Sequence, residues 1–197
     1  MKSEQFLAIG LTGGIASGKT LASQHLSRKY PVHDADLLVH ELYKSDQQLI
    51  GQIADLFGSD VVENGVVRRD RLRKLVFNDA DMLRALNKMV HPAVTNLLRK
   101  LIRRSKENQE RSIFVIPLLC ENGWNRELDG TLLVACNPEI QIERVIRRDQ
   151  CCISEAENVI SSQMSVEEKI KYCDWMIENN GSREDFLQSL DHWEGQL

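Results

Sequence analysis

The chain has 197 residues, of which 42% are hydrophobic and 27% charged, and its formal net charge is −4. This length suits one well-packed domain, the composition argues against extensive disorder, and the acidic balance argues against bulk binding of nucleic acid or membrane surfaces. The sequence has no run of about 18 apolar residues that would predict a transmembrane helix, and its five cysteines include no CxxC pair, so we expect reduced thiols in a cytoplasmic protein.

Short apolar runs predict the strands of the fold. They lie at residues 6–12, 32–33, 113–119, 131–136 and 175–178. Helical spacing of apolar residues lies between or beside these runs, at residues 19–29, 94–102, 139–148 and 154–173. Strands that alternate with helices indicate an α/β fold in which a parallel sheet is covered on both faces.

The stretch between the second and third predicted strands is different in kind. From Leu37 to about residue 109 the sequence offers helical patterns and no convincing strand. We therefore expect a helical insertion at about 37–109, within one domain whose core comprises residues 1–36 and 110–197.

A glycine-rich motif follows the first predicted strand. Residues 13–20, Gly13-Gly14-Ile15-Ala16-Ser17-Gly18-Lys19-Thr20, fit the phosphate-loop pattern G-x-x-x-x-G-K-[ST] between a strand and a helix. Gly13 and Gly18 permit backbone angles that turn successive N–H groups toward phosphate oxygens, and the following helix directs its positive end at the same anion. Lys19 is expected at the β- and γ-phosphates and Thr20 at Mg²⁺, while Ala16 is expected to keep a negative φ.

The motif predicts nucleotide binding without specifying the class of enzyme. The guanine signature of GTPases, Asn-Lys-x-Asp, is absent, since Asn87-Lys88-Met89-Val90 lacks the Asp. No transporter-ATPase signature of the Leu-Ser-Gly-Gly-Gln kind occurs either. Small-molecule kinases are therefore favoured.

Two carboxylates follow the second predicted strand, Asp34 and Asp36. Strand C-termini in an open α/β sheet face the binding crevice, where a kinase for an alcohol needs a carboxylate to orient the hydroxyl and accept its proton. Either residue suits this role. The alternative is that both cap the helix that begins near Leu37, and one Asp can cap while the other is catalytic.

Basic side chains share one face of the helix predicted at 139–148. Gln141, Arg144 and Arg148 lie at spacings of three and four residues, and the arginines could close over a triphosphate and neutralise charge in the transition state. The alternative is a solvated face paired with Glu143 and Asp149.

Taken in order, these residues resemble the dephospho-coenzyme A kinase family over nearly the whole chain. Further fragments that are similar to the family lie at Phe57-Gly58, Gly65, Arg69, Leu72, Phe77, Leu86-Asn87, His91-Pro92, Pro117-Leu118-Leu119 with Glu121, Gln163, Lys169, Asp174, Asn179 and Gly181. The resemblance implies a three-layer P-loop kinase fold with a five-stranded parallel sheet, a helical substrate-binding insertion and a lid at about 139–165.

The resemblance also implies the reaction and the roles of individual residues. The implied reaction moves the γ-phosphate of ATP, with Mg²⁺, to the ribose 3′-hydroxyl of dephospho-coenzyme A, the last step of coenzyme A synthesis. By this analogy Asp36 is the base, and Lys19 and Arg144 stabilise the transferring charge. Nucleotide contacts are implied for residues 13–20, Leu21, Arg144, Arg148 and Asn179, the last near the adenine. Acceptor contacts are implied for Asp36, Arg69, His91 and Glu121.

Two other functions are compatible with the motifs. One is a different small-molecule kinase, for a nucleoside or nucleotide, because such enzymes also combine a phosphate loop, an acceptor domain and an arginine lid. The other is a nucleotide-dependent switch that binds ATP without turnover, although such a protein would not need the base Asp36. The sequence carries no signal for the oligomeric state, and the preference for ATP over GTP rests on the resemblance.

Overall fold

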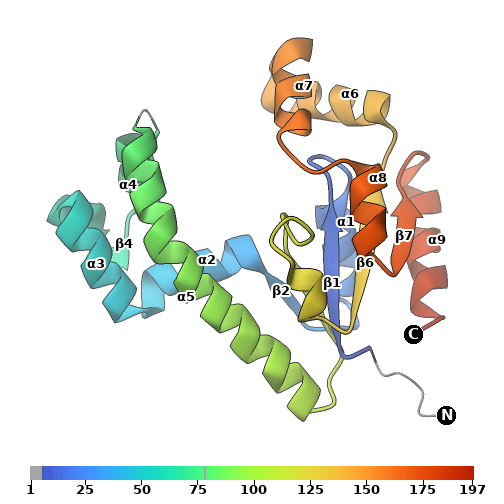
Figure 1. Ribbon diagram of the computed structural model, residues 1–197, viewed down its shortest axis with the longest axis horizontal. Helices are drawn as coiled ribbons and strands as arrows, with labels where there is room; N and C mark the ends of the chain where they lie inside the picture. The colour runs from blue at the N-terminus through green and yellow to red at the C-terminus, as the bar shows by residue number, and fades with distance from the viewer. Residues whose placement is uncertain (1–5, 78) are drawn as a thin grey trace. The chain divides into compact units, whose positions relative to one another are not determined.

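The computed structural model describes residues 6–77 and 79–197 and contains a five-stranded sheet. In spatial order the strands are β2 (Val32–Asp34), β5 (Ser112–Val115), β1 (Ala8–Gly13), β6 (Gly130–Ala135) and β7 (Trp175–Glu178) (Figure 1). The pairs β1–β5, β1–β6 and β6–β7 are parallel, with Leu11 opposite both Val115 and Leu132. The predicted α/β class with a five-stranded parallel sheet is confirmed.

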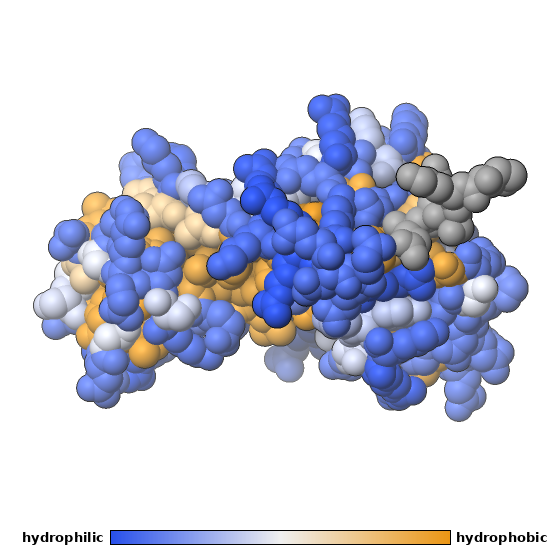
Figure 2. All heavy atoms as spheres, turned by 90° about the horizontal axis from the view of Figure 1, so that it is seen from below, coloured by the Kyte–Doolittle hydropathy of each residue, from blue (hydrophilic) through white to orange (hydrophobic). Residues whose placement is uncertain are grey.

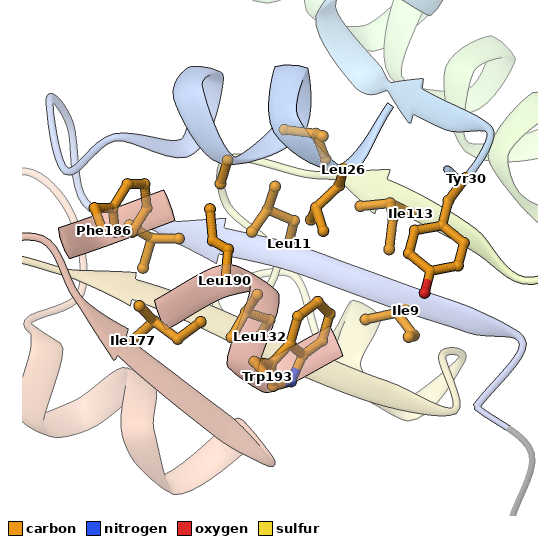
Figure 3. Packing of buried hydrophobic residues seen from close by; sticks show 13 residues of the cluster. Ile9, Leu11, Leu26, Tyr30, Ile113, Leu132, Ile177, Phe186, Leu190 and Trp193 are labelled. Atoms are coloured by element: carbon orange, nitrogen blue, oxygen red, sulfur yellow. The ribbon is translucent and has the colours of Figure 1, made fainter. Parts of the chain in front are cut away.

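Two helices bury one face of this sheet. Leu26 of α1 (Lys19–Leu26) and Leu190 and Trp193 of α9 (Arg183–Glu194) gather over Leu11 and Leu132 (Figure 3). All four leucines have no solvent exposure, and burial of such a side chain contributes about 1.5–3 kcal/mol relative to leaving it in water. Because every residue of β1 and β6 is buried, these strands read as continuous apolar runs rather than as alternating ones.

The opposite face is partly covered by the segment that follows β5. A Cβ at Gly10 would lie 2.5 Å from Cδ1 of Leu119 and 2.7 Å from Cδ1 of Leu128, so a larger residue would force these side chains to move. The strand predicted at 113–119 ends earlier, at Val115, and turns occupy residues 117–123. Pro117 explains the early end, because proline has no N–H to donate to a strand partner.

The connection from β6 to β7 contains α6 (Pro138–Asp149), α7 (Ile153–Ser161) and α8 (Val166–Lys169), followed by a short 3-10 helix (Ile170–Tyr172). The single helix predicted at 154–173 is therefore wrong. The break comes at Ser165, whose hydroxyl accepts from the Glu168 N–H while the Glu168 carboxylate accepts from the Ser165 N–H, which starts a new helix.

Residues 34–103 form a second compact unit, separate from the one that comprises residues up to 33 and from 104 onward. Its helices are α2 (Ala35–Ser45), α3 (Gln47–Phe57), α4 (Arg69–Val76) and most of α5 (Ala80–Glu107). The expectation that this stretch contains no strand is wrong, because β3 (Val62–Glu63) and β4 (Val66–Val67) form a short antiparallel hairpin. Its turn is Asn64-Gly65, both at positive φ, as tight hairpin turns require.

This second unit has an apolar core of its own. Ile53 is fully buried, and Leu49, Val61 and Leu72 are almost so. Hydrophilic side chains cover most of the face seen in Figure 2, with apolar patches between them. Within the described part of the chain, no helix combines the length and the apolar character that a membrane crossing requires.

Candidate active site

The loop between β1 and α1 has little room for side chains. At Gly13 (φ 155) a Cβ would lie 2.3 Å from the Val134 carbonyl oxygen, and at Gly18 (φ 113) it would lie 2.2 Å from Nδ2 of Asn179. Cβ atoms in real proteins essentially never lie this close to non-bonded heavy atoms. Both positions therefore require glycine for space, and Gly18 also for its left-handed backbone.

The backbone angle of Ala16 differs from the one expected for a residue that carries a side chain. Its φ is 55°, in the left-handed region, and the prediction that it would keep a negative φ is wrong. A methyl group is allowed there at a cost of about 1–2 kcal/mol. The tight curve of the loop imposes this angle at a position where glycine would adopt it without strain.

The loop leaves polar groups directed to its inside. The hydroxyl of Ser17 is buried and has no hydrogen-bond partner. Gly18, at the N-terminus of α1, offers no side chain to cap the helix, so the first N–H groups of α1 are available to an anion. The Lys19 ammonium donates to the carbonyls of Gly13 (2.8 Å) and Gly14 (2.7 Å), which holds it across the loop. A buried unpaired hydroxyl, an uncapped helix start and a cation together fit the phosphates of a nucleotide.

Side chains from α6 and from the end of β7 hold the carbonyls of the loop. Gln141 donates to the Ile15 carbonyl at 2.8 Å. The buried Asn179 donates to the Ser17 carbonyl at 2.7 Å, and Arg144 reaches the same carbonyl at 3.5 Å. These donors occupy carbonyls of the loop, so its N–H groups can face a ligand, apart from that of Ser17, which donates to the Gly14 carbonyl at 3.3 Å, and that of Ile15.

Gln163 completes this arrangement and was not predicted as a site residue. Its side-chain oxygen accepts from the Ile15 N–H at 3.1 Å, so Gln141 and Gln163 grip both sides of one residue. Gln163 follows α7 in a short non-helical connection. The sequence signalled it only as a fragment similar to the family, because a glutamine between two helices has no pattern of its own.

A small cavity of about 270 Å³ lies beside the loop. It is lined by Ala16, Gly18, Leu21, Arg144, Asn179, Gly181 and Arg183. The structure thus brings together five of the predicted nucleotide contacts, Ala16, Gly18, Leu21, Arg144 and Asn179, and adds Arg183, the first residue of α9, which the sequence analysis missed. Arg144 donates two hydrogen bonds to Asn179, one to the main-chain oxygen at 3.0 Å and one to the side-chain oxygen at 3.5 Å.

Two other predicted nucleotide contacts stand apart from this network. Arg148 is bidentate to Asp149, with two contacts of 2.7 Å, which is the solvated pairing that we considered as the alternative. The hydrogen bond to Asp149 raises the pKa of Arg148. Thr20, the second residue of α1, is exposed at the end of the loop.

The two carboxylates after β2 have different environments. Asp34 caps α2, since its Oδ1 accepts from the N–H groups of Asp36 (2.9 Å) and Leu37 (3.4 Å). Asp36 lies in the first turn of α2 and lines an open pocket of about 630 Å³ within the unit 34–103. Arg69 lines the same pocket, where its guanidinium lies 3.3 Å from Nδ1 of His40. The capping alternative therefore holds for Asp34.

The predicted acceptor contacts are gathered only in part. Asp36 and Arg69 share a pocket, whereas His91 is exposed on α5 and does not line it. Glu121 belongs to the other unit. There its Oε1 lies 2.8 Å from the ammonium of the fully buried Lys169 and accepts from the Met164 N–H at 3.2 Å.

Comparison with known proteins agrees with this geometry. A family model described as dephospho-CoA kinase matches residues 7–185. A dephospho-CoA kinase from Fusobacterium nucleatum is 38% identical over 191 residues, which cover 95% of this chain and 96% of that protein. One from Lactobacillus johnsonii is 35% identical over 185 residues, which cover 92% of this chain and 93% of that protein.

Solved structures give the same result. The dephospho-CoA kinase from Campylobacter jejuni matches with a TM-score of 0.73 and 25% identity, over 96% of both chains. A shikimate kinase from Acinetobacter baumannii, at a TM-score of 0.54 and 14% identity over 98% of this chain and 95% of that one, shares the fold alone. The resemblance found in the sequence is confirmed, and the chain belongs to the dephospho-CoA kinase family.

Proposed function

We propose that this chain transfers the γ-phosphoryl group of ATP to the ribose 3′-hydroxyl of dephospho-coenzyme A and so forms coenzyme A. The observation that carries the proposal is the loop at residues 13–20, with its buried unpaired Ser17 hydroxyl, its uncapped helix start and its cation Lys19. Membership of the dephospho-CoA kinase family specifies the acceptor. We place the reaction in the cytoplasm, where the thiols that the sequence contains stay reduced.

The nucleotide site divides the work among three groups of the chain. The N–H groups of the loop and of the first turn of α1 bind phosphate oxygens, and ATP supplies the transferable γ-phosphoryl group when bound. Lys19 and Arg144 bring positive charge to oxygens whose negative charge shifts during transfer. Gln141, Gln163 and Asn179 keep the loop in shape by holding its main chain.

Magnesium would be held mainly by phosphates and water. Mg²⁺ binds few protein ligands in kinase sites and keeps several waters. Within the described residues no group of three or more His, Cys, Asp or Glu side chains is placed to bind a metal, so a cage of protein ligands is not part of this site. The exposed hydroxyl of Thr20, at the end of the loop, fits the role of a single protein ligand.

We assign the role of base to Asp36 rather than to Asp34. The Asp34 carboxylate is occupied by two N–H groups of α2, whereas Asp36 lines a pocket together with the cation Arg69. In that pocket Asp36 would orient the acceptor hydroxyl and take its proton as the bond to phosphorus forms. His91 and Glu121 remain weaker candidates for acceptor contacts, since neither lines this pocket.

Two matched substitutions test this assignment. Asp36→Asn should leave folding and ATP binding intact and lower kcat about 10²–10⁴-fold, because an amide cannot accept the proton. Asp34→Asn is the control, because asparagine caps a helix as well as aspartate does and turnover should stay close to that of the unmodified chain. If the two variants exchange these phenotypes, Asp34 is the base.

The acceptor is tested by incubating the chain with Mg-ATP and separate candidate alcohols. Dephospho-coenzyme A should be phosphorylated, and nucleosides and nucleoside monophosphates should stay unmodified, as followed by mass spectrometry of the products. Phosphorylation of a nucleoside monophosphate with dephospho-coenzyme A untouched would refute the proposed acceptor. ATP binding without turnover of any acceptor would instead indicate a switch protein.

A further inference from the structure

Two cysteines that are distant in the sequence lie close together in the unit that comprises residues up to 33 and from 104 onward, called the core unit below. Cys120 lies in the turns after β5, and Cys173 lies between the short helix Ile170–Tyr172 and β7. Their Sγ atoms are 3.8 Å apart, although 53 positions separate the residues along the chain. Both thiols are free. Neither residue has a part in the phosphoryl transfer proposed above.

We propose that Cys120 and Cys173 form a reversible intramolecular disulfide when the chain meets a peroxide, and that this disulfide lowers kinase turnover. The effect on turnover rests on the proposed function, whereas formation of the bond does not. Cys120 and Cys173 both lie outside regular helices and strands, in connections that can shift more easily than the sheet. A disulfide needs a sulfur separation of about 2.05 Å, so the two sulfurs must approach by roughly 1.8 Å.

The surroundings make the two thiols unequal. A hydrogen bond from Cys173 is the main reason that the pKa of Cys120 is lowered; the nearby Lys169 ammonium also lowers it, while burial and the Glu121 carboxylate oppose this. The same hydrogen bond, together with burial, raises the pKa of Cys173. Because the thiolate is the reactive form of cysteine, we assign Cys120 as the attacking thiol of this proposal and Cys173 as the resolving thiol.

The chemistry balances with one peroxide per disulfide. The Cys120 thiolate attacks one peroxide oxygen, so that an S–O bond forms, the O–O bond breaks and the departing hydroxide takes a proton to become water. Cys173 then attacks the Cys120 sulfur, an S–S bond forms, the S–O bond breaks, and the second hydroxide leaves with the Cys173 proton. Two thiols are oxidised, and hydrogen peroxide is reduced to two waters.

A short chain of contacts links this cysteine pair to the phosphate loop. Glu121, next to Cys120, accepts from the Met164 N–H at 3.2 Å and pairs with Lys169 at 2.8 Å. Gln163, next to Met164, accepts from the Ile15 N–H of the loop. When the two sulfurs approach, Cys120 and the neighbouring Glu121 move, and this displaces Met164 and Gln163, which holds the Ile15 N–H. Because displacements of about 1 Å in a catalytic site can cost about a hundredfold in rate, a ten- to hundredfold loss of turnover is expected.

The experiment uses the full chain with Cys151 and Cys152 replaced by serine, because Cys152 is exposed and this adjacent pair would be a competing source of oxidised sulfur. After treatment with hydrogen peroxide, the intact mass should fall by that of two hydrogens. A non-reducing digest should contain a peptide that joins Cys120 to Cys173. Turnover with Mg-ATP and dephospho-coenzyme A should drop ten- to hundredfold and return on addition of dithiothreitol.

Adding Cys173→Ser is the matched control. This variant should give no cross-linked peptide, and its Cys120 should appear as a sulfenic acid that a dimedone probe captures. Absence of the Cys120–Cys173 peptide from the oxidised parent would overturn the proposal. A cross-link with unchanged turnover would overturn its regulatory part. A reduced chain without kinase activity would refute the proposed function instead, and the digest would still decide whether the disulfide forms.

Discussion

The ion pair between Glu121 and Lys169 offers a quantitative test of the core unit. The Lys169 side chain has no exposure and that of Glu121 is 19% exposed, with the ammonium 2.8 Å from Oε1. Lys169→Met keeps most of the apolar stem and removes the charge. In this variant the Glu121 carboxylate keeps one donor, the Met164 N–H at Oε1. Its buried Oε2 has no hydrogen-bond partner in the unmodified chain either. Removal of one partner of a buried pair costs about 3–5 kcal/mol of unfolding free energy.

A loss of this size is a large part of the stability of an ordinary domain, about 5–15 kcal/mol in total. Urea unfolding of four proteins measures it: the unmodified chain, Lys169→Met, Glu121→Gln and the double variant. Glutamine still accepts from the Met164 N–H and carries no charge, so the double variant should recover about 2 kcal/mol or more relative to the sum of the single losses. Strictly additive losses would refute the view that the two charges depend on one another.

Three further predictions concern single residues. Asp34→Ala should lower the unfolding free energy by about 1 kcal/mol through loss of the α2 cap, and an effect in urea titrations no larger than that of Asp34→Asn would contradict this. Ala16→Gly should raise the unfolding free energy by up to about 1 kcal/mol, because relief of the left-handed strain exceeds the entropy that glycine adds to the unfolded chain; a clear loss in the same titration would argue against strain at Ala16. Burial is the main reason that the pKa of His33 is lowered, with Arg104 also lowering it and Glu110 opposing. The unfolded chain therefore takes up the proton first, and the unfolding free energy should fall as the pH drops below about 6.5 toward the folded pKa; His33→Asn should flatten this dependence, and an unchanged profile would contradict the assignment.

The sequence was sufficient where a local pattern determined the structure. The apolar run before Gly13 predicted a buried strand, and the glycines predicted a tight turn with backbone angles that other residues avoid; both features are present. The hairpin at Asn64-Gly65 was missed because each of its strands has only two residues, too few for an alternating pattern. The break at Ser165 carried a signal, since serine followed three residues later by glutamate marks the start of a helix.

The sequence predicted the loop of the candidate site better than it predicted the side chains that hold the main chain of this loop. Gln141 and Arg144 were found from their shared helix face, but the carbonyls that they hold depend on how α6 packs, and spacing along the sequence does not reveal this. Asn179 was expected near adenine, and nothing in the sequence indicated that its buried side chain also donates to the Ser17 carbonyl. The left-handed angle of Ala16 could not be read from its side chain, because the closure of the loop imposes it.

The most direct test of the account is a crystal structure of the chain with a non-hydrolysable Mg-ATP analogue and dephospho-coenzyme A. We predict the β- and γ-phosphates within hydrogen-bond distance of the N–H groups of residues 13–20, with the Lys19 ammonium moved from the loop carbonyls to the phosphates. We also predict that the ribose 3′-oxygen lies between the γ-phosphorus and the Asp36 carboxylate. Phosphates bound away from the loop, or a 3′-hydroxyl with Asp36 turned from it, would contradict the proposed reaction.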